Sequence, residues 1–111
     1  MVSTDEAKTT RIRQLNDQLR TRFTGGRVVI TSGVRALGVN AVAEILAEVS
    51  EYEDFTEDVY GEHDFGAFTF DGQKFFWKID YYDLDMKFLS PDTSDPAVTN
   101  RVLTILLASE Y

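Results

Sequence analysis

The 111-residue sequence predicts a single α+β domain in which helices cover one face of a small, mostly antiparallel sheet. Two runs of aromatic and β-branched residues flank Asp71-Gly72, a dipeptide typical of a two-residue hairpin turn. Two other segments place apolar residues at helical spacing, and a third begins with the helix-start pair Asp95-Pro96. We therefore expect the order helix, strand, helix, three strands, helix. Residues 1–111 form one domain in this prediction, with residues 1–4 disordered.

The first helix is predicted over about residues 5–22, because apolar side chains recur there every three or four positions. These are Ile12, Leu15, Leu19 and Phe23. A glycine of Gly25-Gly26 is expected to end the helix in the left-handed conformation. Residues 27–31 then form a short strand, and Ser32-Gly33 makes a turn.

The second helix is predicted over residues 40–51, with one apolar stripe and one acidic face. The stripe consists of Val39, Val42, Ala43, Leu46 and Val49, and the face exposed to water carries Glu44, Glu48 and Glu51. The acidic run that follows shows no strong periodicity. We interpret it as a loop with a solvated surface.

The central hairpin follows from the turn at Asp71-Gly72. A type I′ turn places Phe68 opposite Phe75 and Gly66 opposite Trp77, so one face is strongly apolar. This inner face carries Phe68, Phe70, Phe75, Trp77, Ile79 and Tyr81. The other face carries Lys74, Lys78 and Asp80, and whether Phe76 and Tyr82 form an interface there stays open. We expect Trp77 to be inaccessible to solvent.

The C-terminal third is predicted to hold a short strand and a helix. Asp83-Leu84-Asp85 makes a turn, residues 86–89 form the third strand of a meander, and Pro91 ends it. Residues 96–109 are expected to be helical, because Asp95 can cap free amides and Pro96 suits the first helical position. This helix is apolar over more than one face, so we expect it to lie across the inner face of the sheet as the most buried helix.

Composition and charge exclude several classes of protein. The chain has no cysteine, which excludes thiolate zinc sites, disulfide scaffolds and cysteine nucleophiles. It has neither an 18-residue apolar stretch nor the apolar core of a signal peptide, so we expect a cytoplasmic protein that does not enter membranes.

Residues 1–35 carry a net charge of +4, whereas residues 36–111 carry −12. An acidic body repels nucleic acid and favours a basic protein partner.

The single histidine, His63, is the one side chain that exchanges a proton easily near neutral pH. A metal or catalytic site there would need carboxylates brought in by folding, and the candidates are Glu62, Asp64, Asp80, Asp83 and Asp85. The opposing interpretation is a structural histidine at the entry to the sheet. Serine-nucleophile and cofactor-binding motifs are absent, and we expect neither a cofactor nor a bound metal.

Several stretches are similar to a known family. These are Leu15-Asn16-Asp17, residues 23–29 (FTGGRVV), residues 32–34 (SGV), residues 60–66 (YGEHDFG), residues 76–83 (FWKIDYYD), Ser90-Pro91-Asp92 and residues 101–105 (RVLTI). In these stretches the chain resembles a bacterial family described as domain of unknown function 3768. The resemblance implies a small accessory protein of plasmids and other mobile elements, and it implies no activity, cofactor or catalytic residue.

The sequence favours a non-enzymatic, acidic protein-binding module. The resemblance adds an accessory or anti-defence role, as an inhibitor of a nucleic-acid-handling protein. The predicted binding residues are Glu51, Glu53, Asp54, Glu57, Asp58, Glu62, His63 and Asp64. The alternative is a metal-assisted hydrolase centred on His63, and the oligomeric state stays open.

Overall fold

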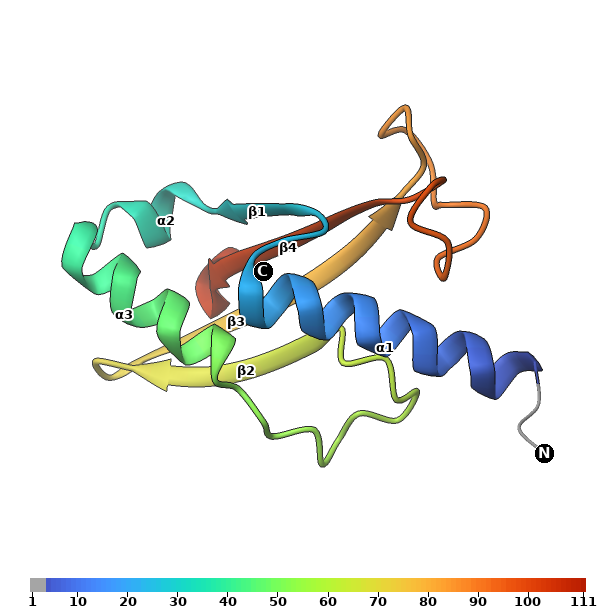
Figure 1. Ribbon diagram of the computed structural model, residues 1–111. Coiled ribbons are helices and arrows are strands. Elements are labelled where there is room, and N and C mark those ends of the chain that lie inside the picture. Colours follow the sequence, from blue (N-terminus) through green and yellow to red (C-terminus); the bar gives the residue numbers. More distant parts are fainter. Residues whose placement is uncertain (1–3) are drawn as a thin grey trace.

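The computed structural model describes residues 4–111 and places the helices on one face of a four-stranded sheet (Figure 1). The elements are α1 (Thr4–Arg22), β1 (Arg27–Ile30), α2 (Ser32–Arg35), α3 (Val39–Ser50), β2 (Phe65–Phe70), β3 (Gln73–Tyr82), β4 (Asn100–Leu107) and the 3₁₀ helix η1 (Ala108–Glu110). The α+β class is confirmed. The expected disorder concerned residues 1–4, of which Thr4 belongs to α1 and residues 1–3 lie outside the described part of the chain.

The sheet has the strand order β1-β4-β3-β2. Strand β3 pairs antiparallel with β2 and with β4, whereas β1 pairs parallel with β4. The sheet is therefore mixed, with antiparallel pairing in the majority. Because β4 lies between β1 and β3, the last strand of the chain is a central strand.

The predicted C-terminal helix over residues 96–109 is wrong, because residues 100–107 form strand β4. Pro96 lies in a turn before the strand, and Asp95 accepts a hydrogen bond from the Ala97 amide instead of starting a helix. Strand β4 is paired on both sides, and four of its five apolar side chains are buried. A strand of this kind reads as a continuous apolar run, which periodicity does not separate from a buried helix.

The hairpin between β2 and β3 has the predicted register. Phe70 pairs with Gln73, Phe68 with Phe75, and Gly66 with Trp77. Asp71 and Gly72 both have positive φ angles, 50° and 77°, as a type I′ turn requires. Phe75 and Trp77 expose no surface, so the prediction that Trp77 is inaccessible is confirmed.

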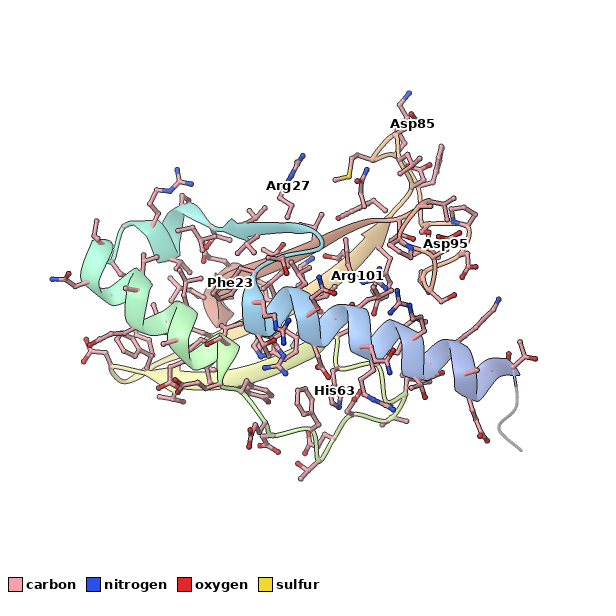
Figure 2. All side chains as sticks on the ribbon, in the orientation of Figure 1. Phe23, Arg27, His63, Asp85, Asp95 and Arg101 are labelled. Carbon is pink, nitrogen blue, oxygen red and sulfur yellow. The ribbon has the colours of Figure 1, made fainter. Side chains whose placement is uncertain are left out.

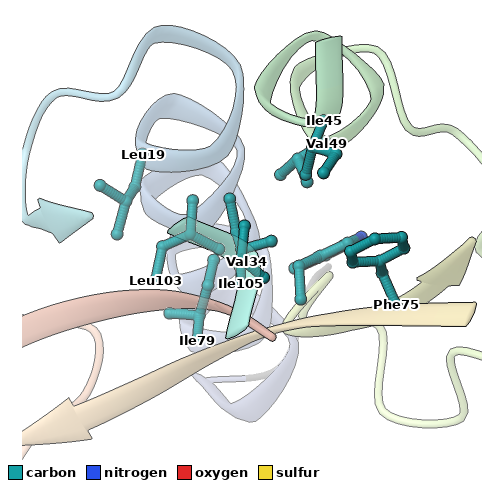
Figure 3. Close-up of a cluster of buried hydrophobic side chains, with 9 residues drawn as sticks. Leu19, Val34, Ile45, Val49, Phe75, Ile79, Leu103 and Ile105 are labelled. Carbon is teal, nitrogen blue, oxygen red and sulfur yellow. The ribbon is translucent and has the colours of Figure 1, made fainter. Parts of the chain in front are cut away.

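The core lies between the sheet and the helices (Figure 3). Leu19 comes from α1, Val34 from α2, and Ile45 and Val49 from α3. They meet side chains of the two central strands, Phe75, Trp77, Ile79, Leu103 and Ile105. The predicted stripe of the second helix needs correction, because Val39 is 85 % exposed and Ala43 is exposed, whereas Ile45 is buried.

Three local features differ from the prediction. Helix α1 is followed by Phe23 in the left-handed region, with φ 57°, before the glycines are reached. Ser32-Gly33 opens the short helix α2, because the Thr31 side chain accepts a hydrogen bond from the Val34 amide. Residues 86–89 form no strand, and only a single bridge joins Leu89 to Tyr82. Each is a case in which a local cap or turn decides the backbone.

Candidate functional site

All eight predicted binding residues lie in residues 51–64, which we call the acidic loop. It joins α3 to β2 and passes beside α1, as the lime-green segment of Figure 1 shows. The structure therefore gathers Glu51, Glu53, Asp54, Glu57, Asp58, Glu62, His63 and Asp64 on one connection. Their side chains do not all point the same way. The inward side of the loop contacts α1 and the sheet, and the outward side is exposed to solvent.

Helix α1 holds the inward side of the acidic loop by its backbone carbonyls. Arg13 Nη1 donates to Gly61 O at 2.9 Å, and Asn16 Nδ2 donates to Glu62 O at 3.0 Å. Arg20 Nη1 donates to Tyr52 O at 2.8 Å. These three residues follow a spacing of three and four positions, so they share one side of the helix. One helix face thus fixes both ends of the loop.

Arg20 is the more buried of the two arginine anchors, with 4 % of its surface exposed. Its Nη1 also donates to Val49 O at 3.1 Å, a carbonyl at the C-terminal end of α3 that accepts the Tyr52 amide at 3.3 Å as well. The guanidinium lies 5.1 Å from the Phe55 ring centroid and 5.4 Å from that of Trp77. Arg20 therefore joins α1, the end of α3 and the sheet core through one cation.

His63, labelled in Figure 2, contacts a carboxylate through one ring nitrogen and an aromatic ring through one ring face. Its Nδ1 lies 2.9 Å from Asp17 Oδ1, and its ring stacks on Phe55 with centroids 3.6 Å apart. Its backbone amide donates to Asp58 Oδ2 at 3.1 Å, and its Nε2 lies 3.8 Å from the same oxygen. Asp17 and Asp58 are the carboxylates that folding brings to this histidine.

The carboxylates predicted as partners of His63 are dispersed. Asp80 binds Lys78 Nζ at 2.7 Å, and Asp83 accepts a hydrogen bond from the Lys87 amide. Figure 2 shows Asp85 at the opposite end of the molecule from His63. Among residues 4–111, no group of three or more His, Cys, Asp or Glu side chains is placed to hold a metal ion. The metal-assisted hydrolase stays a prediction that no contact in the described chain favours.

Two predicted binding residues point inward. Burial raises the pKa of the Asp64 carboxyl above its ordinary value, and the nearby Glu62 carboxylate raises it further. Glu62 Oε1 accepts a hydrogen bond from the Tyr81 hydroxyl at 2.9 Å, and Asn16 Nδ2 donates to that hydroxyl at 2.8 Å. Arg101 Nε completes the chain by donating to Asn16 Oδ1 at 2.7 Å. Glu62 and Asp64 therefore belong to the junction between the loop and the sheet.

The outward side of the acidic loop carries free carboxylates and two exposed apolar side chains. Glu51, Glu53 and Glu57 are exposed, and within the described chain their side chains have no hydrogen-bond or ion-pair partner. Asp54 is exposed too, although its Oδ1 accepts a hydrogen bond from the Thr56 hydroxyl at 2.7 Å. The sequence analysis missed Val59 and Tyr60, which are 86 % and 82 % exposed. The available signal was that these two large apolar residues are adjacent in the sequence and follow the acids Glu57 and Asp58.

A hollow of about 400 Å³ separates the acidic loop from the first half of β2. Its loop wall includes Asp54, Glu57, Val59 and Tyr60, and its other wall is formed by residues 64–67. The hollow is thus bordered by the exposed side chains of the loop on one side and by a strand on the other.

Comparison with known proteins gives one match. A family model described as "Protein of unknown function (DUF3768)" matches residues 30–110, which include the whole acidic loop. The similar stretches at residues 15–17 and 23–29 lie before the matched range. No curated protein and no solved structure matches the chain. None of the helices in residues 4–111 is long and apolar enough to cross a membrane.

Proposed function

Because the chain belongs to the family described as protein of unknown function DUF3768, we propose its role from the geometry of the acidic loop. The protein is a non-enzymatic module that uses this loop to bind a basic segment of another protein. The observation that carries the proposal is the exposure of Val59 and Tyr60 beside the unpaired carboxylates of Glu53 and Glu57.

This arrangement has the composition of a protein-binding surface. Binding energy at interfaces concentrates in a few residues, among which tyrosine is enriched. Charges around such a centre add specificity and raise the rate of association with an oppositely charged partner. Tyr60 supplies the large apolar contact, and Glu51, Glu53 and Glu57 supply the negative field. A lysine- or arginine-rich segment fits both features.

The loop is also ordered before any partner arrives. Hydrogen bonds from Arg13, Asn16 and Arg20 to loop carbonyls fix its path, and the stacked pair of Phe55 and His63 fixes its middle. Ordering a loop on binding costs free energy that a pre-ordered loop does not lose again. The exposed carboxylates can therefore act from fixed positions.

The partner class we propose is a protein that handles nucleic acid. Such proteins present lysine and arginine to phosphates, and an acidic surface of fixed shape competes for the same side chains. The module would then act as an inhibitor or accessory factor. Its association with mobile elements and with an anti-defence role rests on the family resemblance alone.

The test compares two triple variants of equal charge. In the loop variant, Glu51, Glu53 and Glu57 are each changed to glutamine; in the control variant, Glu44→Gln, Asp71→Asn and Asp85→Asn neutralise three exposed acids elsewhere. Each protein is immobilised and used to capture purified DNA-binding proteins at low and high salt, and displacement of labelled DNA is measured by anisotropy.

We expect the loop variant to lose at least tenfold in affinity and the control variant to stay within about twofold of the wild type. Salt should weaken wild-type binding, because the exposed charges are screened. Equal losses in both variants would show that only net charge matters, and unchanged binding in the loop variant would contradict the proposal.

A further inference from the structure

We propose that the basic segment binds as an extended strand along the free edge of β2, in the hollow beside the acidic loop. This inference rests on the proposed function and adds the geometry of the partner. It also predicts the order of side chains in the bound segment, in which basic and apolar residues alternate.

The hydrogen-bond pattern between β2 and β3 shows which backbone N–H and C=O groups of β2 point away from the sheet. Strand β2 is at the edge of the sheet, and Ile79 N donates to Asp64 O at 2.8 Å, which marks a hydrogen-bonded pair. Antiparallel pairs alternate, so the backbone groups of Gly66, Phe68 and Phe70 face β3. Those of Phe65, Ala67 and Thr69 face away from the sheet.

The contact of Ala67 agrees with this assignment. Its amide donates to the Tyr52 hydroxyl at 3.3 Å, outside the sheet. The backbone groups of Phe65 and Thr69 have no such partner within residues 4–111. The edge is thus open at Phe65 and Thr69, and an added strand would replace the Tyr52 hydroxyl at the Ala67 amide between them.

The sequence of β2 gives an independent reason to expect a partner strand. Edge strands of monomeric proteins are usually protected by a charged residue, a proline or a bulge. Strand β2, with the sequence FGAFTF, contains no charged residue and no proline, and its register with β3 has no bulge. An edge that lacks these three protections is a template for strand addition.

The two faces next to this edge differ in chemistry, which defines the side chains of the added strand. Phe65 packs on Phe76 and Tyr111 on the outer face of the sheet, with centroid distances of 5.2 and 6.2 Å. On the other side, the hollow beside β2 is lined by the carboxylates of Asp54, Glu57 and Asp58 in the acidic loop. Successive side chains of an added strand would therefore meet the aromatic cluster and the acidic loop in turn.

The experiment uses a capped seven-residue peptide in which lysine and valine alternate. Hydrogen exchange of individual amides is followed by NMR, with and without the peptide. We expect the amides of Phe65 and Thr69 to exchange quickly in the free protein and at least tenfold more slowly with bound peptide. The amides of Gly66 and Phe68 serve as internal controls, because β3 protects them in both states. Bound peptide without new protection at Phe65 and Thr69 would overturn strand addition.

Two N-methylated peptides test the backbone directly. One is methylated at the valine amides and the other at the lysine amides, so that each blocks one edge of the strand. Strand addition predicts that only one of the two peptides loses binding. If the peptide methylated at valine loses binding, the added strand is antiparallel to β2; if the peptide methylated at lysine loses binding, it is parallel. Equal effects of both peptides, or no effect of either, would overturn strand addition.

A matched pair of protein variants completes the test. Thr69→Pro removes an outward N–H without removing a bond to β3, and proline is tolerated at such edge positions; Thr69→Ala keeps the amide. We expect Thr69→Pro, but not Thr69→Ala, to lose at least tenfold in peptide affinity while both fold. If the peptide does not bind at all, or both variants bind like the wild type, strand addition fails. The capture of DNA-binding proteins through Glu51, Glu53 and Glu57 would still decide the proposed function separately.

Discussion

The acidic loop is held on its inward side through its backbone carbonyls, whereas its outward side presents side chains to solvent. The inward side is held by its backbone, because cationic and amide side chains of α1 bind the carbonyls of Tyr52, Gly61 and Glu62. The outward side leaves the carboxylates of Glu53 and Glu57 without a partner in the described residues and exposes Tyr60. Because backbone carbonyls anchor the loop, the glutamates on its outward side stay free, so order and surface charge are separated in this molecule.

The largest expected effect comes from removing the buried anchor. Arg20→Met keeps most of the apolar stem but leaves the carbonyl of Tyr52 without its donor, whereas Val49 O keeps the Tyr52 amide. A buried carbonyl left unsatisfied costs roughly 1–3 kcal/mol, so we expect the free energy of unfolding to fall by about 2 kcal/mol. Urea denaturation measures this change.

The matched control is Arg22→Met, which removes the same charge from the same end of α1. Arg22 is exposed, and it has no ion pair or hydrogen bond in the described chain. We expect this variant to change the free energy of unfolding by no more than about 0.5 kcal/mol. Similar losses in the two variants would mean that the charge at the helix end, and not the anchoring of the loop, stabilises the fold.

A smaller effect of opposite sign is expected at Asp64. Because burial raises the pKa of its carboxyl in the folded state, ionisation favours the unfolded chain. The penalty is absent below the ordinary pKa, appears as pH rises toward the folded pKa, and is complete above it. We expect Asp64→Asn to stabilise the protein at pH 7 by less than about 1 kcal/mol, since one pKa unit equals about 1.4 kcal/mol and solvent screens this half-buried group.

The measurement for Asp64→Asn is urea denaturation of variant and wild type at several pH values between 3 and 7. The gain in stability should shrink as pH falls toward the ordinary pKa of aspartate. A variant that is less stable than the wild type at pH 7, or a gain that does not depend on pH, would contradict the assignment of Asp64 to the buried junction.

The smallest effect on stability is expected at the outward side. Tyr60→Ala removes a ring that is 82 % exposed, so the free energy of unfolding should change by no more than about 0.5 kcal/mol. Binding to a basic partner should nevertheless fall at least tenfold, because Tyr60 is the largest exposed apolar contact of the loop. Calorimetric titration and urea denaturation of the same sample separate the two quantities. A strong loss of stability would show that the two sides of the loop are not independent.

The hairpin and strand β4 show how far sequence alone predicts this fold. The register of β2 and β3 was predictable, because Asp71-Gly72 sets a two-residue turn and the period of two then assigns every side chain to a face. Strand β4 was not. Val102 and Leu106 on one face and Leu103 and Ile105 on the other are all buried, so the pattern that distinguishes strand from helix is missing.

The candidate site, too, was predictable from the sequence only in part. The position of the acidic loop was predictable from its composition, since charged residues without periodicity form solvated connections. The roles of its acids were not, because the free or engaged state of a carboxylate depends on groups distant in sequence. Glu62 meets Tyr81, and Asp58 and Asp17 both meet His63.

The sequence by itself determined the α+β class, the hairpin with its buried Trp77, and an acidic connection before β2, because turn chemistry, side-chain period and composition are local properties. Only the tertiary structure decided that the last apolar segment is a central strand and that α1 holds the loop by its carbonyls. Both depend on pairings between residues far apart in the chain, such as Trp77 with Ile105 and Asn16 with Glu62. The burial of paired backbone and polar groups selects these contacts, and no local pattern encodes them.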